Sequence, residues 1–359
     1  MQKFVTLLLI LACTASLHAL GKSPVNRASH GVILQYHHIA EDTPAITSTR
    51  PDQFAAHMAY LARSGFEVWP LERLVEAVRN NQTTPEKVVA ITFDDAYINI
   101  YENAFPLLRD YGWPFTIFVA TSPVGTQPNS FLNWDQLREM KTHGATIANH
   151  SHSHTHLLRR LDHESAADWR KRIAADITTA QTRLTAELGE TPRYLAYPYG
   201  EYNAAILDIV RDLGFTGFGQ QSGAVGAGAD FAVLPRFPFG GIYNEQTSFE
   251  TKVNSLPLPV APVQIDPLLP DGETMPQLSL TFDGQSDLRL DALNCFGPGG
   301  TRLRLDWQGN TVTATPAGPV PVARSRYNCT MPTKAGGRFY WFSQMWIRKN
   351  PDGSWYPEA

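Results

Sequence analysis

Apolar and polar positions follow a regular order of short strand-like runs and helical stretches over the first two thirds of the chain. Apolar residues recur at the three- and four-residue spacing of amphipathic helices, and the longest such stretch is 163–188. Between the helical stretches, runs rich in apolar, β-branched and aromatic residues predict strands at 32–36, 67–69, 88–93, 115–120, 145–148, 194–197 and 216–219. Repeated strand–helix units predict an α/β fold with a parallel sheet. Seven strands favour a distorted (β/α) barrel over an open sheet.

Glycines mark the expected helix ends. Gly65, Gly112, Gly144 and Gly214 each follow a helical stretch. A left-handed residue is expected at such a position, and glycine adopts that conformation without steric cost. The positions of these glycines therefore agree with the helices predicted from the spacing of apolar residues.

The pattern changes after residue 255. Six prolines fall within 256–276, which predicts a linker. Beyond the linker, side chains alternate with period two, which predicts strands over 278–282, 288–290, 302–305, 311–315 and 339–347. We therefore expect a main domain over 25–255 and a small all-β C-terminal module over 277–359.

The first residues have the composition of an export signal. A short basic start and the apolar stretch 4–12 predict a signal peptide over 1–19, and the stretch is too short to span a bilayer. Residues 10–13 also resemble a lipoprotein box, which would place a lipid anchor on Cys13, whereas Ala15 and Ala19 suit ordinary cleavage. We expect an exported protein, periplasmic or secreted, whose only membrane contact would be such an anchor.

Composition and cysteine usage narrow the class of protein. The 359 residues are 43% hydrophobic and 18% charged, as in a globular protein, and a net charge of -4 disfavours nucleic acid as a partner. Once Cys13 is assigned to the signal, Cys295 and Cys329 remain. In an exported protein we expect a disulfide between them, with two unpaired buried thiols as the alternative.

Two groups of polar residues lie where predicted strands end. Asp94 and Asp95 close the run that begins at residue 88, and His150 and His154 follow the run that ends at 148. Carboxylates and histidines in such loops supply the parts of a mononuclear metal site with a nearby base. Either group alone would fit a polar surface loop equally well.

The two adjacent aspartates are expected to differ in role. Successive side chains of a strand point to opposite faces, so Asp94 and Asp95 cannot both face one metal unless the strand ends and bends there. We expect one carboxylate to bind the metal and the other to act as general base.

These residues resemble, in kind and in order, the motifs of the polysaccharide deacetylase family, also called carbohydrate esterase family 4 or the NodB-homology domain. The resemblance covers about 32–236. The family's Thr-Phe-Asp-Asp-Gly motif is similar to 92–96, its His-Ser/Thr-x-x-His motif to 150–154, and its third motif, around Pro-Tyr-Gly, to 197–200.

The resemblance implies a role for each matching residue. Asp94 would be the catalytic base, and Asp95, His150 and His154 would bind a divalent metal, usually Zn²⁺, with Co²⁺ or Ni²⁺ as alternatives. The backbone N–H of Tyr199 would help to stabilise an oxyanion.

Two positions depart from the first and third motifs. The arginine that usually precedes the third motif is absent, with Leu-Ala-Tyr at 195–197, so we expect Arg236 to orient Asp94 in its place. Ala96 stands where the family has glycine. We expect the backbone there not to need a positive φ.

The general acid must also come from an unusual place. The family's C-terminal histidine motif is not visible near Arg236. His37, at the end of the first predicted strand, is similar to the early histidine that serves as acid in the poly-N-acetylglucosamine deacetylase branch. We assign His37 this role, with His38 and a purely structural His37 as the alternatives.

The resemblance implies a metal-dependent hydrolase that removes acetyl groups from an N-acetylated glycan, a polymer of N-acetylglucosamine, to give acetate and free amine. The expected partner is an acetylated polysaccharide or oligosaccharide. The alternatives are an O-acetyl esterase acting on xylan-type glycan and a carbohydrate-binding protein without catalysis. Aromatic faces suit pyranose rings, and the candidates for a sugar groove are Trp69, Tyr97, Trp113, Trp134 and Tyr202.

Overall fold

The computed structural model describes residues 29–127, 129–283 and 288–357. The expected signal over 1–19, including Cys13, lies outside these residues and stays a prediction. Within the described part of the chain, no helix is both long enough and apolar enough to cross a bilayer.

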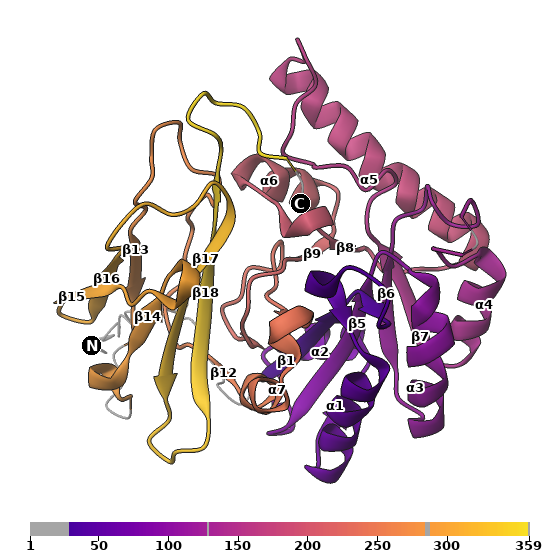
Figure 1. Ribbon diagram of the computed structural model, residues 1–359, viewed down its shortest axis with the longest axis horizontal. Helices are drawn as coiled ribbons and strands as arrows, with labels where there is room; N and C mark the ends of the chain where they lie inside the picture. The colour runs from indigo at the N-terminus through magenta and orange to yellow at the C-terminus, as the bar shows by residue number, and fades with distance from the viewer. Residues whose placement is uncertain (1–28, 128, 284–287, 358–359) are drawn as a thin grey trace, which may run out of the picture.

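A nine-stranded sheet forms the centre of the main domain (Figure 1). Its main path runs β10-β1-β5-β6-β7-β8-β9, with β11 paired to β1 and β4 paired to β5. Every pairing is parallel except that of β1 with β10. The strands are β1 (His30–Tyr36), β4 (Glu67–Val68), β5 (Val88–Asp94), β6 (Phe115–Val119), β7 (Ala145–Asn149), β8 (Tyr194–Ala196), β9 (Thr216–Phe218), β10 (Val225–Gly226) and β11 (Phe237–Pro238).

The sheet curls into a half-barrel, which confirms the expected distorted (β/α) barrel. Each strand predicted for the main domain is present, with its ends shifted by at most two residues. The central strands β1 and β5 are buried along their whole length. That burial explains why they read as continuous apolar runs instead of alternating ones.

Helices cover the outside of the sheet and each buries one face. In α1 the buried face includes Phe54, Met58 and Leu61, and burying each side chain contributes about 1.5–3 kcal/mol. The glycines expected at helix ends, 65, 112, 144 and 214, have positive φ values of 73°, 65°, 92° and 70°. The helices are α1 (Pro51–Arg63), α2 (Leu71–Arg79), α3 (Phe105–Tyr111), α4 (Trp134–Thr142), α5 (Ala166–Leu188), α6 (Ala204–Asp212) and α7 (Gln246–Val253).

Two further sheets build the C-terminal part of the chain, which lies beside the main domain in Figure 1. One has the order β12-β18-β17-β14 and the other β13-β16-β15. In the main domain, two further short strands, β2 (His38–Ile39) and β3 (Ser48–Thr49), pair with each other outside the nine-stranded sheet. The C-terminal strands are β12 (Leu256–Pro257), β13 (Leu278–Thr281), β14 (Asn294–Phe296), β15 (Arg304–Gln308), β16 (Thr311–Thr315), β17 (Ala323–Pro332) and β18 (Phe339–Arg348).

The structure differs from the expected strands of this module in two ways. Residues 288–290 form no strand, and a short 3-10 turn begins at Leu290 instead. Three alternating residues are too few to hold a strand when no neighbouring strand pairs with them. The strands β14 and β17 were not expected, because many of their residues are polar and only partly buried.

Cys295 and Cys329 form a disulfide, as expected. They face each other in the antiparallel pair of β14 and β17, and both are fully buried. The bond closes a separation of 34 residues inside the module's own core. A crosslink of this kind restricts the unfolded chain and so stabilises the folded module.

Part of the proline-rich segment 256–276 lies alongside β18 (Phe339–Arg348), although it precedes that strand in the sequence. Its first residues pair with Tyr340 and Trp341, and the N–H of Leu269 donates to the carbonyl of Ile347 at 3.0 Å. Leu258 and Leu269 are buried in or against the module. The domain boundaries drawn from the sequence stay a prediction.

Candidate metal centre and active site

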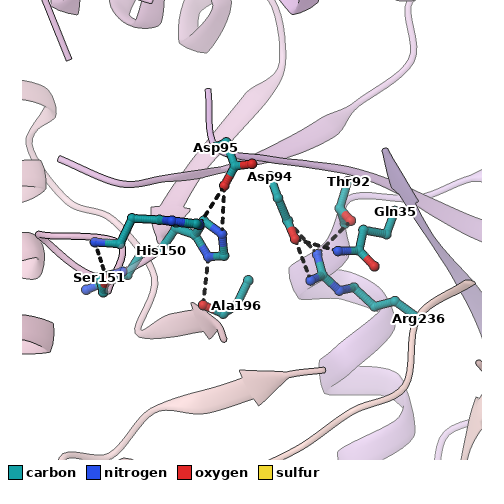
Figure 2. A network of polar contacts seen from close by, with 10 residues as sticks. Gln35, Thr92, Asp94, Asp95, His150, Ser151, Ala196 and Arg236 are labelled. Carbon is teal, nitrogen blue, oxygen red and sulfur yellow. Dashed lines mark hydrogen bonds and ion pairs between the residues drawn. The ribbon is translucent and has the colours of Figure 1, made fainter. Parts of the chain in front are cut away.

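The backbone turns sharply where β5 ends. β5 ends at Asp94, and Asp95 has a positive φ of 71°. The strand therefore ends and bends between the two aspartates, which is the condition for both carboxylates to lie near one metal site. The two carboxylates enter separate networks of polar contacts (Figure 2).

Ala96 corrects one expectation. Its φ is 61°, so this position does need a left-handed backbone, contrary to the sequence prediction. For a residue with a Cβ this conformation costs about 1–2 kcal/mol. The side chain of Ala96 is 1% exposed and belongs to the main core, and this burial offsets part of the cost.

Asp95, His150 and His154 converge on one point. The Oδ1 atom of Asp95 lies 3.0 Å from the Nε2 atom of each histidine. All candidate ligand atoms of the three residues lie within 4.8 Å of one another. Bonds of about 2.0–2.1 Å in a tetrahedral zinc site would separate ligand atoms by about 3.3 Å. The spacing therefore suits a single small cation, with coordination positions left over.

The protonation of His150 also fits a cation. Its Nδ1 lies 2.8 Å from the carbonyl oxygen of Ala196, which can only accept, so Nδ1 carries the proton. In the neutral ring, Nε2 then turns a lone pair toward Asp95. Asp95 Oδ1 is buried and lies beside both Nε2 atoms, so a neutral ring offers it no proton to accept. A cation placed between these atoms removes the repulsion, so the donor set fits a divalent metal.

The same contacts shift the pKa values of Asp95 and His150. Burial alone would raise the pKa of Asp95, but His150 and His154 outweigh it and hold that pKa well below its usual range. Burial would lower the pKa of His150, and the carboxylates of Asp95 and Asp94 reverse this and raise it. Carboxylate and imidazoles thus form one electrostatically coupled cluster.

Asp94 lies in a separate, fully buried network. The guanidinium of Arg236 donates to both carboxylate oxygens, at 2.7 and 2.8 Å, and Gln35 donates to Oδ2 at 2.6 Å (Figure 2). Arg236 is itself held by Thr92 and by the carbonyl of Gly219. Burial would raise the pKa of the Asp94 carboxyl, but Arg236 and then His150 lower it below its usual value. Asp94 is therefore ionised at neutral pH.

His37 and His38 follow β1 and have different surroundings. Burial lowers the pKa of His37, whereas the carboxylates of Asp95 and Asp94 act to raise it, so this ring lies within their field. His38 instead stacks on Tyr97 at 3.6 Å, and burial lowers its pKa to about 4. Of the two histidines, His37 has the closer electrostatic contact with both aspartates.

Tyr199 lies in a tight turn, η3 (Pro198–Gly200), directly after β8. Its φ is 60°, a left-handed conformation that a residue with a side chain rarely adopts. Its ring lies 4.8 Å from that of His154 and only 3.8 Å from the nearly parallel ring of His156. The third motif thus reaches the edge of the metal cluster.

Sequence reasoning missed three residues of this region: Gln35, His156 and Glu201. Gln35 lies two residues before His37, so strand alternation could have placed it on the same face. Glu201 directly follows the third motif and accepts a hydrogen bond from His156 at 2.8 Å. The partners of Glu201 lie far from it in the sequence, so no local pattern indicates its contacts.

A cavity of about 410 Å³ opens beside the metal cluster. Its lining includes Asp95 and His154 together with Tyr97 and Phe131, whose rings stack at 5.2 Å. Of the aromatic residues suggested for a sugar groove, Tyr97 alone lines this cavity. The others pack elsewhere: Trp69 and Tyr202 are buried, Trp113 stacks on Tyr111, and Trp134 lies under Arg183.

Comparison with known sequences finds a family similarity for the central part of the chain. Residues 81–218 match the sequence profile of polysaccharide deacetylases. A poly-β-1,6-N-acetyl-D-glucosamine N-deacetylase of Escherichia coli (strain K12) is 24% identical over 277 residues, which cover 65% of this chain and 41% of that protein. The protein of the same name from Staphylococcus aureus (strain MSSA476) is 31% identical over 159 residues, 42% of this chain and 54% of its own. The chain thus spans about half, or less, of these relatives.

Solved structures share the fold. A Streptococcus pyogenes deacetylase, PplD, in complex with acetate, is 24% identical and has a TM-score of 0.56, over 62% of this chain and 98% of that one. IcaB from Ammonifex degensii is also 24% identical, with a TM-score of 0.54 over 61% and 96% of the two chains. At this level of identity the likeness establishes the fold alone.

The cluster of Asp95, His150 and His154 predicts one metal site per chain. Titration of the metal-free protein with Zn²⁺ in a calorimeter should show one equivalent bound, and His154→Ala should weaken binding by more than the about 10–100-fold typical of an outer-shell loss. The control His152→Ala removes a histidine that bonds Thr121 instead and should leave the affinity unchanged. Equal affinity in the wild type and His154→Ala would rule out this site.

The pH dependence of binding has a defined sign. Protons and the metal compete for Nε2 of His150, whose pKa is raised from 6.5 in the metal-free protein. Zn²⁺ affinity should therefore fall as the pH is lowered, and the fall should begin above pH 6.5.

Proposed function

We propose that this chain is a member of the polysaccharide deacetylase family, an exported metal-dependent enzyme that removes acetyl groups from a polymer of N-acetylglucosamine. The reaction releases acetate and leaves a free amine on the glycan. The observation that carries the proposal is the pair of adjacent aspartates held in two different ways, Asp95 beside His150 and His154, and Asp94 locked by Arg236. The names of the relatives support the glycan class, and the buried disulfide supports export.

Asp95, His150 and His154 would hold a divalent metal, with Zn²⁺ the best match to the donor set and Co²⁺ or Ni²⁺ as alternatives. When bound, such a metal polarises a carbonyl and lowers the pKa of water. The hydrogen bond from His150 to the carbonyl of Ala196 fixes the ring that would carry it.

Asp94 is the general base of the proposed reaction. It is ionised, and the fork of Arg236 and the amide of Gln35 hold its two oxygens in fixed positions. A carboxylate held in this way can accept the proton of the attacking water without first reorganising. Because the pKa of Asp94 is lowered, the base stays ionised throughout the neutral range.

Tyr199 and His37 act on the oxyanion and on the leaving group of the proposed reaction. The backbone N–H of Tyr199 donates to the oxyanion that forms when water adds to the acetamide carbon. His37 delivers a proton to the departing amine nitrogen. Burial lowers the pKa of this ring, and the carboxylates of Asp95 and Asp94 oppose that shift and favour the protonated form from which the proton is delivered.

Neither alternative function gains support from a particular observation. An O-acetyl esterase would use the same residues, but the relatives described above are named N-deacetylases. A protein that only binds carbohydrate would not need a buried base held by three hydrogen bonds.

Asp94→Asn tests the base. The variant keeps the metal residues and an oxygen for Arg236, but it cannot take a proton, so acetate release from N-acetylglucosamine oligomers should fall by about 10²–10⁴-fold. Zn²⁺ affinity should change by less than the about 10–100-fold typical of an outer-shell loss, because Asp94 bonds Gln35 and Arg236 and not the metal residues. The matched control Asp306→Asn changes an exposed carboxylate on β15 and should retain full activity.

The substrate panel decides between the functions. Metal-loaded wild type should release acetate from β-1,6- or β-1,4-linked N-acetylglucosamine oligomers. Release from acetylated xylan alone would establish the esterase instead, and no release from any acetylated glycan would leave a binding protein.

His37→Gln tests the acid. The variant should lose about 10²-fold or more in kcat on an N-acetylated oligomer, because an amine is a poor leaving group without a proton donor. The loss should be smaller on an O-acetyl ester, whose leaving group needs less help. His38→Gln is the control and should change both rates alike; full amide turnover by His37→Gln would remove His37 from the mechanism.

A further inference from the structure

Glu201 is a fully buried carboxylate that directly follows the Tyr199 turn. His156 donates to its Oε2 at 2.8 Å, Arg324 donates to Oε1 at 3.2 Å, and the hydroxyl of Tyr356 donates to the same Oε1. Charge-assisted bonds of this kind are stronger and more directional than neutral ones. Both oxygens of Glu201 are therefore fixed in place.

The partners of Glu201 come from two parts of the chain. His156 lies in the loop after β7, two residues beyond His154 of the metal cluster. Arg324 is the second residue of β17, and Tyr356 lies after β18, so both belong to the C-terminal part. The C-terminal module thus reaches a carboxylate at the rim of the active site.

The same residues touch Tyr199. The ring of His156 lies nearly parallel to that of Tyr199, at an interplanar angle of 8°. The guanidinium carbon of Arg324 lies 5.5 Å from the centre of the Tyr199 ring, within the range of a cation–π contact. A left-handed backbone at a tyrosine persists only when its surroundings hold it.

We infer that Arg324 and Tyr356, acting through Glu201, are positioning residues for the backbone N–H of Tyr199, so that the C-terminal module completes the active site. The inference rests on the proposed function for the role of that N–H. The module is then a working part of the enzyme, and its docking onto the barrel sets the geometry of the oxyanion-binding turn.

A second arginine of β17 supports this arrangement. Residues two apart on a strand share a face, and Arg326 points to the barrel as Arg324 does. Arg326 donates to the carbonyl of Gln220 at 3.2 Å and to Ser222 at 3.1 Å. The carbonyl of Gln221, between these two residues, accepts the N–H of Arg236. One face of β17 therefore braces both the Tyr199 turn and the loop that leads to Arg236.

The test compares two arginines that both join the module to the barrel. Arg324→Gln should lower kcat on an N-acetylglucosamine oligomer about 10-fold with KM and Zn²⁺ affinity unchanged, because the Tyr199 N–H acts on the transition state. Arg324→Lys should recover part of the loss. Arg338→Gln removes contacts to Asn254 and Glu86 far from the turn and should leave kcat unchanged. Tyr356→Phe, which deletes one hydroxyl, is a milder second variant.

Hydrogen exchange separates this inference from the proposed function. In the metal-loaded protein, amides over 197–202 should exchange about 10-fold faster in Arg324→Gln and Tyr356→Phe than in Arg338→Gln. If the wild type releases no acetate, the proposed function fails while exchange still tests the positioning. Unchanged exchange over 197–202 in Arg324→Gln, or an equal loss of kcat in Arg338→Gln, overturns the inference.

Discussion

The ion pair between Asp94 and Arg236 is the constraint on which the rest of the site depends. Both side chains are fully buried, and each charge removed from water costs several kcal/mol unless it is matched by a partner with complete hydrogen bonding. The two-pronged contact, with Gln35, Thr92 and the carbonyl of Gly219 around it, meets that requirement. It also joins the end of β5 to the segment before β11, far apart in sequence, and so fixes where the base lies relative to the metal cluster.

The site is built from backbone that is unfavourable by itself. Most of the non-glycine residues with positive φ in the described part of the chain lie here, at Asp95, Ala96, Ser151, His154 and Tyr199. Each such conformation costs about 1–3 kcal/mol and is kept only where surrounding contacts impose it. The bend after Asp94 gives the two aspartates separate environments, and the packing of the barrel and the C-terminal module supplies the contacts that hold the bent loops.

Much of this arrangement could be predicted from local sequence. The strands of the barrel, the helix ends and the convergence of Asp95, His150 and His154 follow from periodicity, glycine positions and motif spacing. The contact between Arg236 and Asp94 was expected from the family resemblance, because the arginine that usually precedes the third motif is missing and Arg236 could replace it. These features depend on residues close in sequence or on a single long-range pairing.

What could not be predicted depends on contacts among several distant segments. The backbone at Ala96 is set by the core into which its methyl group packs, not by its own preference. β17 was missed because polar residues such as Arg324 and Arg326 lie along it, and their partners belong to the barrel. The hydrogen bonds of Glu201 link the loop after β7 to the last described residues, which no motif relates.

The most direct measurement is the free energy of unfolding of Arg236→Gln against the wild type. Removing one partner of a buried pair should cost about 3–5 kcal/mol at pH 7, whereas Arg304→Gln, which removes an exposed pair with Asp306, should cost about 0–1 kcal/mol. Because the pKa of Asp94 in the folded protein is below its unfolded value of 3.8, the pair stabilises the protein above that pH. That contribution is lost as the pH falls through the folded pKa. The difference in free energy of unfolding between the wild type and Arg236→Gln should therefore become smaller in acid. An Arg236→Gln variant within about 1 kcal/mol of wild type at pH 7 would contradict the account.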